Sequence, residues 1–344
     1  MSSYHMQFTY KGRTNNDPLG PEPLDGELDT RPHLIVVAFS PDNGETDAFL
    51  AMESIFDTKY DGTSRYDYGA AYHDVAKPTI TMIKSDYSDL TLYEFREIAR
   101  WLTGAKKSSW LDLQMPSQSA VGVYETAYSF LCKCTNLTQH KLDGRVIGVV
   151  ATFESVSPWA YSPLQNLKIK DGDSEIISGT ENEPFTFTLN NQSDDIYSYL
   201  YPNISITNTT QDSFILTNNT LETYEGTAQN ATTSMVDVVD NEVVVLTNRG
   251  IILTDSAQGA GNRFNWVWPK MLPGDNEFSF VGGGKIIFAY RYPIKAGNCI
   301  LGLDDRIHGV DIEEPTWEYA TDLEVREAFL AAYEAIFGGG AGVI

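Results

Sequence analysis

Basic residues and long apolar runs are both scarce in this chain. Its 344 residues hold 24 Lys and Arg against 47 Asp and Glu, which gives a formal net charge of −23 at pH 7. A charge of this sign repels the phosphates of nucleic acid and of anionic membranes, so we expect no direct nucleic-acid recognition. No run approaches the roughly 20 apolar residues that cross a bilayer, and no apolar signal segment opens the sequence. We therefore expect synthesis in a cytoplasm and no membrane insertion.

Cysteine and histidine are also rare, and their spacing fits no metal or catalytic site. Cys132 and Cys134 lie two residues apart, so on a strand they share a face and cannot easily bridge each other. The five histidines include no pair at metal-ligand spacing, and no Gly-x-Ser-x-Gly nucleophile motif occurs. Adjacent acids such as Asp304 and Asp305 are expected by chance among 47 acidic residues. We expect free thiols, no metal, no cofactor and no catalytic residue, and hence no enzyme.

Short β-type runs fill most of the first half of the chain. Alternating or continuous apolar runs that are bounded by Gly, Pro, Asn and Asp predict strands. The run Ala48–Phe56 fits a helix or a strand about equally, with a slight preference for a strand. The stretch 57–76 places aromatic residues among Gly, Asp and Ser, which is typical of a long exposed loop. The strands predicted in this half are Met6–Tyr10, His33–Phe39, Lys77–Lys84, Trp110–Leu113, Tyr124–Cys134 and Arg145–Ser155.

One helix interrupts these strands. The segment Leu90–Leu102 reads LTLYEFREIARWL and carries its apolar residues on one stripe. Thr91 and Glu94 have the spacing of a capping box, and Gly104 stands where a glycine commonly ends a helix. The sequence therefore predicts an antiparallel sheet packed on a single helix at about 90–103, with Trp101 in the core between them.

The composition changes near the segment Ser155–Pro163, which reads SVSPWAYSP. Residues 1–157 hold 14 basic and 21 acidic residues, net −7, whereas residues 158–344 hold 10 and 26, net −16. With the turn residues of this segment, the shift predicts an N-terminal domain over 1–157 and a second domain over 158–315. A C-terminal helix and a Gly-rich tail are expected over 316–344.

The second half has the pattern of a β-sandwich followed by a helix. Short strand-like runs between Gly, Asn and Asp turns indicate a sandwich or jelly roll. The glycines Gly282–Gly284 predict a hairpin turn between the runs Glu277–Val281 and Lys285–Tyr292. Residues 321–337 have an amphipathic helical pattern. The other predicted strands are Phe185–Leu189, Asn203–Thr207, Ser213–Thr217, Met235–Asp240, Glu242–Thr247, Ile251–Thr254 and Asn265–Trp268.

Four aromatic residues of the second half are candidates for carbohydrate stacking. Trp266 and Trp268 share a face of one predicted strand, and Tyr290 and Tyr292 share a face of another, with Asn and Asp nearby. Sugar rings stack on exposed aromatic faces. Large aromatic side chains on sandwich strands are, however, more often part of the core, and both interpretations stay open.

In their order, these features resemble the distal tail proteins of long-tailed, non-contractile bacteriophages and related prophage tail components. The likeness rests on the start MQFTYKG, the strands HLIVVAF and KPTITMIK, the helix YEFREIARWLTG leading to SSWLDL, and the strand pair that ends VVATFESVSPWAYSP. It covers about residues 5–163. Farther on, MLPGDNEFSFVGGGKIIFAY is similar to the penultimate hairpin of the galectin-like β-sandwich that members commonly carry. The resemblance implies a mainly β protein, although a helix at 321–337 is not part of the family pattern.

The resemblance also implies a structural role in the virion, at the distal end of the tail. Family members form a homohexameric ring through their N-terminal domains. This ring joins the tail tube protein to the tail-tip or tail-associated lysin protein, and receptor-binding and tape measure proteins are further partners. We interpret Tyr60, Tyr66, Tyr68 and Tyr72, in the aromatic stretch, as candidate ring or partner contacts. The alternative function is a carbohydrate-binding protein whose C-terminal sandwich adsorbs to host cell-wall carbohydrate.

Overall fold

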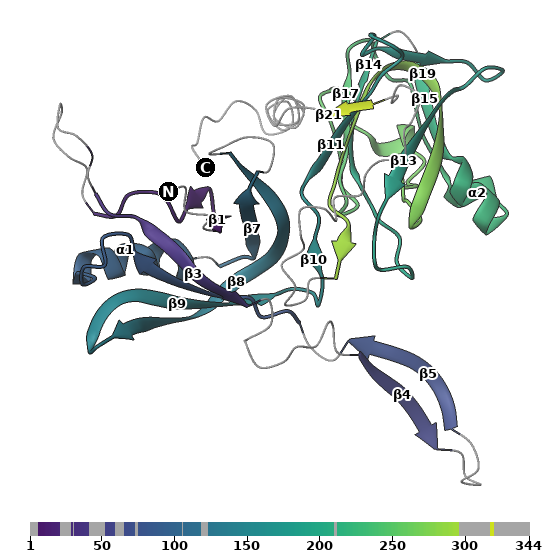
Figure 1. Cartoon of the computed structure of the whole chain (residues 1–344). Coiled ribbons are helices and arrows are strands. Elements are labelled where there is room, and N and C mark those ends of the chain that lie inside the picture. The colour runs from purple at the N-terminus through teal and green to yellow at the C-terminus, as the bar shows by residue number, and fades with distance from the viewer. Residues whose placement is uncertain are drawn as a thin grey trace. The chain divides into compact units, whose positions relative to one another are not determined.

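The chain is mainly β and divides into two compact units (Figure 1). The first unit contains strands β1–β10 and β20 with helix α1, and the second contains β11–β19 and β21 with helix α2. In the computed structural model, strands β4, β5 and β21 are described by their backbone alone. The described residues are 6–20, 29, 31–40, 52–58, 65–72, 75–104, 106–117, 123–209, 212–295 and 317–319.

The first unit is built on one curved antiparallel sheet. Its described strands follow the order β2-β1-β7-β8-β9-β6-β3, and β10 pairs with both β8 and β20. Residues alternate between the two faces of a strand, so Phe8 and Tyr10 of β1 and Leu111 and Leu113 of β7 all reach the core. The strands are β1 (Gln7–Tyr10), β2 (Arg13–Thr14), β3 (Leu34–Ser40), β6 (Thr79–Lys84), β7 (Ser109–Pro116), β8 (Tyr124–Leu142), β9 (Arg145–Ser155), β10 (Ala160–Tyr161) and β20 (Pro293–Ile294).

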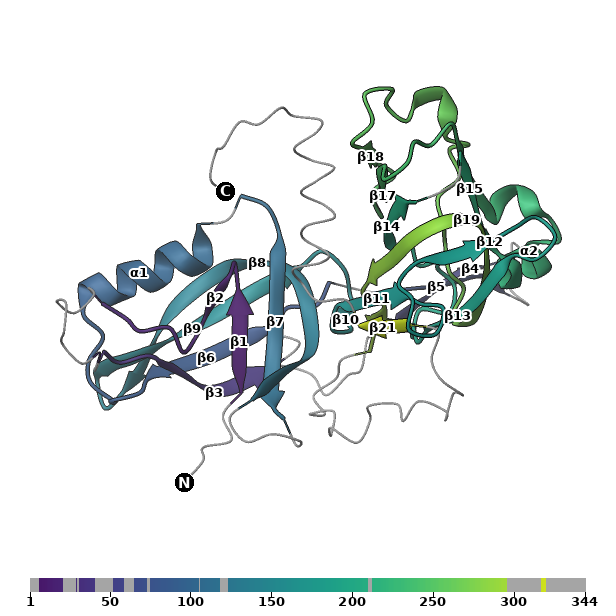
Figure 2. The same cartoon turned by 90° about the horizontal axis from the view of Figure 1, so that it is seen from above.

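Helix α1 (Leu92–Thr103) lies along this sheet and begins at the predicted capping box (Figure 2). The Thr91 hydroxyl accepts a hydrogen bond from the Glu94 N–H, and the Glu94 carboxylate accepts one from the Thr91 N–H. Trp101 is buried against the sheet, where its ring stacks on Phe8 with the centroids 5.3 Å apart. Its indole N–H donates to the Tyr10 carbonyl at 2.7 Å. The predicted helix and its core tryptophan are therefore confirmed.

Asn15 joins two strands that lie far apart in the order of this sheet. Its side-chain carbonyl accepts from the Phe8 N–H of β1 at 2.8 Å, and its side-chain amide donates to the Leu34 carbonyl of β3 at 2.9 Å. Its backbone carbonyl also accepts from the Leu34 N–H at 3.0 Å. Since both strands contribute to the same hydrophobic core, this buried asparagine closes the curved sheet around that core.

Strands β8 and β9 form a long hairpin that an Asp-Gly pair closes. Asp143 and Gly144 have φ of 50° and 81°, the left-handed region that a two-residue hairpin turn requires. Leu142 pairs directly with Arg145 across the turn. The predicted strands Tyr124–Cys134 and Arg145–Ser155 are confirmed, and β8 continues to Leu142 because the turn residues come only there.

The aromatic stretch 57–76 is not a single loop, and that prediction is wrong. Strand β5 (Arg65–Tyr72) lies inside it and pairs with β4 (Met52–Thr58) as a hairpin (Figure 1). Tyrosine favours strands, and the partner strand stabilises an extended backbone that loop composition alone does not predict. The slight preference for a strand at 48–56 agrees with β4. Three of the candidate contact residues lie on β5 and Tyr60 lies outside the described residues; the three are Tyr66, Tyr68 and Tyr72.

The second unit is a two-layer sandwich whose layers share strand β19. One layer contains β13, β15, β16 and the first half of β19. The other contains β11, β12, β14, β17, β18, β21 and the second half of β19. The elements are β11 (Gln165–Ile169), β12 (Ile177–Gly179), β13 (Phe185–Asn191), β14 (Asn203–Asn208), β15 (Ser213–Asn218), α2 (Asn219–Glu225), β16 (Thr232–Val236), β17 (Val243–Leu246), β18 (Ile252–Thr254), β19 (Gly274–Tyr290) and β21 (Trp317–Tyr319).

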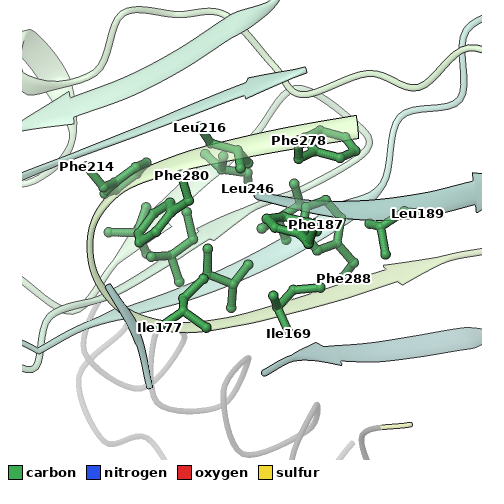
Figure 3. Close-up of a cluster of buried hydrophobic side chains, with 14 of the residues drawn as sticks. Ile169, Ile177, Phe187, Leu189, Phe214, Leu216, Leu246, Phe278, Phe280 and Phe288 are labelled. Carbon is green, nitrogen blue, oxygen red and sulfur yellow. The ribbon is translucent and has the colours of Figure 1, made fainter. Parts of the chain in front are cut away.

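Strand β19 bends at its glycines and passes from one layer to the other (Figure 3). The predicted hairpin is wrong here, because the two halves of β19 pair with other strands and not with each other. Gly282 has a φ of 135°, which side chains rarely allow, and a Cβ on Gly284 would collide with the Thr207 carbonyl oxygen. The glycines therefore mark a bend between layers, a geometry that needs them as much as a hairpin does.

Phenylalanine rings from both layers meet in the core of the second unit (Figure 3). Phe278 and Phe288, one from each half of β19, have their ring centroids 5.4 Å apart. Phe187 of β13 contacts both rings, at 5.4 and 5.8 Å. Burial of one such side chain contributes about 1.5–3 kcal/mol, so this cluster holds the two layers together.

Two predicted strands of the second half differ in the structure. The run Asn265–Trp268 is not a strand, because Trp266 takes a left-handed φ of 60° that interrupts an extended backbone. The run Met235–Asp240 is replaced by β16, which begins earlier, at Thr232, because it follows the register of β15. The predicted helix at 321–337 lies outside the described residues.

The chain enters and leaves the second unit through two paired strands. Ala160 and Tyr161 of β10 pair with Ile294 and Pro293 of β20, and all four residues belong to the first unit. The segment Leu164–Tyr292 between them belongs to the second unit, and the chain contributes to that unit again after β20, because β21 pairs with β11. The sequence-based domain limits placed both strands in the sandwich.

Candidate functional site

The thiols of the described chain are free and protonated at neutral pH. Cys132 is buried and Cys134 half-buried, and neither forms a disulfide. Burial raises the pKa of both thiols, that of Cys134 to about 11, which makes them poor nucleophiles. Among the residues that the structure describes, no cluster of His, Cys, Asp and Glu could hold a metal ion. No helix of these residues is long and apolar enough to cross a membrane.

One end of the second unit is formed by three connections between strands. Strands β13 and β15 end there and β16 and β19 begin there, because Asn191 pairs with Gly274 and Thr217 with Thr232. Loops at the end of a sandwich commonly carry binding residues, since the sheets hold them in place. The three connections are 192–202, 219–231 and 264–273.

Large aromatic side chains gather on these three connections. Exposure reaches 90% for Tyr197, 71% for Tyr224 and 58% for Trp266. Aromatic rings this exposed contribute little to the core, so they are available for binding. We call the following five residues the aromatic end: Tyr197, Tyr199, Tyr224, Trp266 and Trp268.

Trp266 is held in a strained and exposed position. Its φ of 60° is uncommon for a bulky residue and costs on the order of 1–3 kcal/mol. Its ring centroid lies 6.0 Å from that of Trp268 and 5.9 Å from that of Phe264. Phe264 also meets Trp268 edge-on at 5.2 Å. The surroundings therefore fix an exposed tryptophan that neither burial nor backbone preference would place there.

Two polar groups that precede Trp266 fix its backbone. The Asn265 side chain accepts from the N–H groups of Ser234 and Val267, at 3.1 and 3.2 Å, and donates to the Thr232 carbonyl at 2.8 Å. Two residues before Asn265, the buried Arg263 guanidinium donates to both oxygens of the buried Glu242 carboxylate, at 2.6 and 3.0 Å. Burial raises the pKa of this carboxyl, and hydrogen bonds from Arg263 and other groups outweigh it and hold the pKa low.

Tyr199 and Tyr224 lie beside an ion pair between Glu225 and Lys270, which links the connections 219–231 and 264–273. The Tyr199 hydroxyl donates to Glu225 Oε1 at 3.0 Å, and Lys270 Nζ donates to the same oxygen at 2.7 Å. Lys270 Nζ also lies 4.2 Å from the centroid of the Tyr199 ring. The hydrogen bond from Lys270 lowers the pKa of Glu225, so the carboxylate stays ionised and keeps these contacts at neutral pH.

The second predicted pair of stacking residues is placed differently. Tyr290 is 4% exposed and its hydroxyl donates to the Asn190 carbonyl at 3.1 Å, so its ring is part of the core. Tyr292 is half-buried and its hydroxyl donates to Gln192 Oε1 at 2.9 Å. Tyr290 therefore cannot stack on a sugar, because its side chain packs into the core between the layers of the sandwich.

A second exposed apolar surface lies at one end of the sheet in the first unit. The turn before α1 is joined there to the end of the β8–β9 hairpin by an ion pair of 3.0 Å between Asp89 and Arg145. A buried ion pair of 2.9 Å between Lys84, at the end of β6, and Glu94, in α1, links the two elements on either side of the same turn. We call this surface the apolar corner, and its exposed residues are Tyr87, Leu92, Tyr93 and Leu142.

Sequence reasoning found part of the aromatic end and missed the rest. Trp266 and Trp268 lie side by side on an irregular segment and not on the predicted strand. Tyr197 and Tyr224 were missed, because exposed tyrosines leave no periodic pattern. The signal that could have found them is a large aromatic residue inside an Asp- and Asn-rich connection between two predicted strands.

Comparison with known proteins gives family matches to both units. A model described as the phage tail protein N-terminal domain matches residues 25–157, and one described as the phage tail C-terminal domain matches residues 172–290. No curated protein matches this chain.

Among solved structures, the Dit protein (gp 19.1) of phage SPP1 is similar in fold, with a TM-score of 0.52 and 11% identity over 83% of this chain and 99% of that one. That protein is described as a paradigm of the hub adsorption apparatus in phages that infect Gram-positive hosts. A chain of the phage P2 baseplate in its activated conformation with Ca gives a TM-score of 0.41 and 8% identity, over 84% of this chain and 99% of that one. The corresponding structure with Sr gives 0.45 and 9%, over the same shares.

Proposed function

This chain belongs to the family of two-domain phage tail proteins, and we propose that it is a subunit of the baseplate or tail tip of a long-tailed bacteriophage. In this proposal the first units form a homohexameric ring at the distal end of the tail. The ring joins the tail tube protein to the tail-tip or tail-associated lysin protein. Receptor-binding and tape measure proteins are further partners, and the chain itself catalyses no reaction.

The observation that carries this proposal is the extent of the matches. The two family models cover most of both units, and the fold likeness spans 99% of the SPP1 protein. The family models support a role in a phage tail, and the fold likeness to the SPP1 protein supports, by analogy, a place in the hub. Because the hub role is taken from a protein of 11% identity, it requires its own test.

A closed ring needs two different surfaces on each subunit. The apolar corner is suited to be one of them, because it exposes four large side chains around the turn before α1, which two ion pairs hold in place. The β4–β5 hairpin is suited to be the other, with the three tyrosines of β5 as candidate contacts. Ring contacts of this kind would bury the apolar corner in the virion.

Electron microscopy of virions tests the proposed role. A gold-labelled tag on this chain should mark the point where the tail tube meets the tip, and the native mass of the isolated hub should contain six copies. Leu92→Asp combined with Tyr93→Asp should prevent incorporation, because two charges would be buried at the ring contact. Ile251→Asp, on an exposed apolar residue of the second unit, is the matched control and should be incorporated normally. Virions without label at the tip would contradict the proposal.

Carbohydrate binding by the sandwich is the second candidate function. The observation that favours it is Trp266, an exposed ring on a strained backbone that Asn265 fixes. Strain of this kind is kept where function requires it more often than elsewhere. The protein should sediment with purified host cell-wall polysaccharide, and Trp266→Ala should abolish this. Sedimentation that the variant retains in full would contradict the role of Trp266.

A further inference from the structure

We infer that the aromatic end binds an uncharged, multi-unit carbohydrate chain, with Trp266 at one contact point and Tyr224 beside Tyr199 at another. This inference rests on the carbohydrate-binding function proposed above and adds the chemical class and the extent of the ligand. The contacts, spacing and charge of the three connections carry it.

The two contact points belong to one continuous surface. The segment from Trp266 to Lys270 joins them, and at Lys270 its ammonium lies on the Tyr199 ring. Hydrogen bonds from Asn218 to the Lys270 carbonyl and from Thr233 to the Val267 carbonyl, both 2.9 Å, hold the segment against the ends of the strands. The two contact points can therefore move apart only if these hydrogen bonds to the strand ends break.

The spacing of the contact points exceeds one stacked ring. Asn265, next to Trp266, donates to the Thr232 carbonyl of the outer strand β16. The Lys270 carbonyl, at the other contact point, accepts from Asn218 on the neighbouring strand β15. Neighbouring strands lie about 4.8 Å apart, and the segment of Trp266 lies on the outer side of β16, so Trp266 and Lys270 are separated by two strand spacings, on the order of 10 Å. A ligand that reaches both points must contain more than one sugar unit.

Two buried polar atoms at this end fit a ligand rich in hydroxyl groups. Asn191 is 1% exposed, and its side-chain carbonyl has no hydrogen-bond partner in the described chain. The buried indole N–H of Trp268 also has none there. Buried polar atoms are normally paired. An unpaired acceptor and an unpaired donor at one surface match sugar hydroxyls, which both donate and accept, directly or through an ordered water.

The charge of the surface selects an uncharged ligand. Residues 164–292 hold 7 basic and 16 acidic residues, net −9. The one lysine of the three connections, Lys270, is paired with Glu225. Such a surface repels phosphate-bearing polymers, whereas its carboxylates accept hydrogen bonds from neutral hydroxyls. The connections also carry Asp194, Asp195 and Glu222, which add to the negative charge of this end.

Calorimetry with the full-length protein tests this inference. The probes are uncharged oligosaccharides of glucose, galactose, rhamnose and N-acetylglucosamine in increasing length, and a poly(glycerol phosphate) teichoic acid. At least one uncharged series should bind more tightly as its chains lengthen, and the teichoic acid should not bind. Trp266→Ala and Tyr224→Ala should each weaken binding about tenfold or more. Trp266→Phe keeps an aromatic face and should bind, which shows that the site folds.

Ile176→Ala is the matched control, because it removes an exposed apolar side chain from the opposite end of the sandwich. It should leave oligosaccharide binding unchanged. Binding by a single sugar as tight as by a chain, full binding by Tyr224→Ala, preference for the teichoic acid, or no binding in any uncharged series would overturn the inference. If both alanine variants instead lose a virion protein, the aromatic end is a protein interface and the inference is wrong. Trp266→Ala and Tyr224→Ala should not change the incorporation of this protein into virions, and that measurement tests the tail role separately.

Discussion

Replacement of Trp101 by Ala tests how helix α1 is attached to the sheet of the first unit. The side chain is 8% exposed, stacks on Phe8 with an interplanar angle of 6°, and donates to the Tyr10 carbonyl. Loss of a buried tryptophan side chain costs about 3–5 kcal/mol. We expect the free energy of unfolding of the first unit to fall by this amount, because Ala neither fills the space nor replaces the hydrogen bond.

Two further variants separate the contributions. Trp101→Phe keeps a ring against Phe8 and loses the indole N–H, so it should cost about 1–3 kcal/mol. Tyr93→Ala removes an exposed ring from the same helix and should change the free energy of unfolding by no more than about 0.5 kcal/mol. The order of the three variants thus tests packing and hydrogen bonding independently.

Hydrogen exchange followed by mass spectrometry is the suitable measurement, because two units need not unfold together and a single transition would mix them. Amides of α1 and β1 report on the first unit, and those of β14 in the second unit serve as the internal control. A loss below about 1 kcal/mol in Trp101→Ala would refute the placement of the helix on the sheet.

Three other changes test the fold at single residues. Gly284→Ala should destabilise the second unit by roughly 1–3 kcal/mol, because its Cβ would collide with the Thr207 carbonyl oxygen, and an unchanged thermal unfolding temperature of that unit would contradict the bend. Asn15→Ala should cost about 2–3 kcal/mol and speed exchange of the Phe8 amide, since two buried hydrogen bonds are lost. Burial raises the pKa of Glu94, but hydrogen bonds from Lys84 and the N-cap outweigh it and lower the pKa. Its stabilisation is therefore full above pH 4.5 and lost as the pH falls through the lowered pKa, and Glu94→Gln should flatten acid unfolding in that range.

Elements that short-range signals determine could be predicted from the sequence. Helix α1 has its capping residues within its own first turn, and the β8–β9 hairpin has Asp143-Gly144 at the turn itself. In both cases the residues that decide the structure are neighbours in the sequence. This is why their positions agree with the structure to within a few residues.

Elements that distant partners determine could not be predicted in the same way. The glycines of β19 fit a hairpin and a bend equally well, and the choice depends on β13 and β14, which lie far away in the sequence. Asn15 lies in a polar stretch that reads as an irregular arm, and only Phe8 and Leu34 together give its side chain a role. For the candidate site, the sequence indicated Trp266 but not the turn that exposes it. Tryptophan rarely adopts the left-handed backbone conformation that Trp266 has, so its local sequence does not predict this turn.

The pairing of β10 with β20 sets a condition on any exchange of the sandwich. Ala160 and Ile294 are direct partners, so the chain leaves the first unit and returns to it at points about 5 Å apart. A later segment also belongs to the second unit, because β21 pairs with β11. Recombination that replaces the sandwich must therefore carry β21 together with residues 164–292, since without β21 the strand β11 would become an exposed sheet edge.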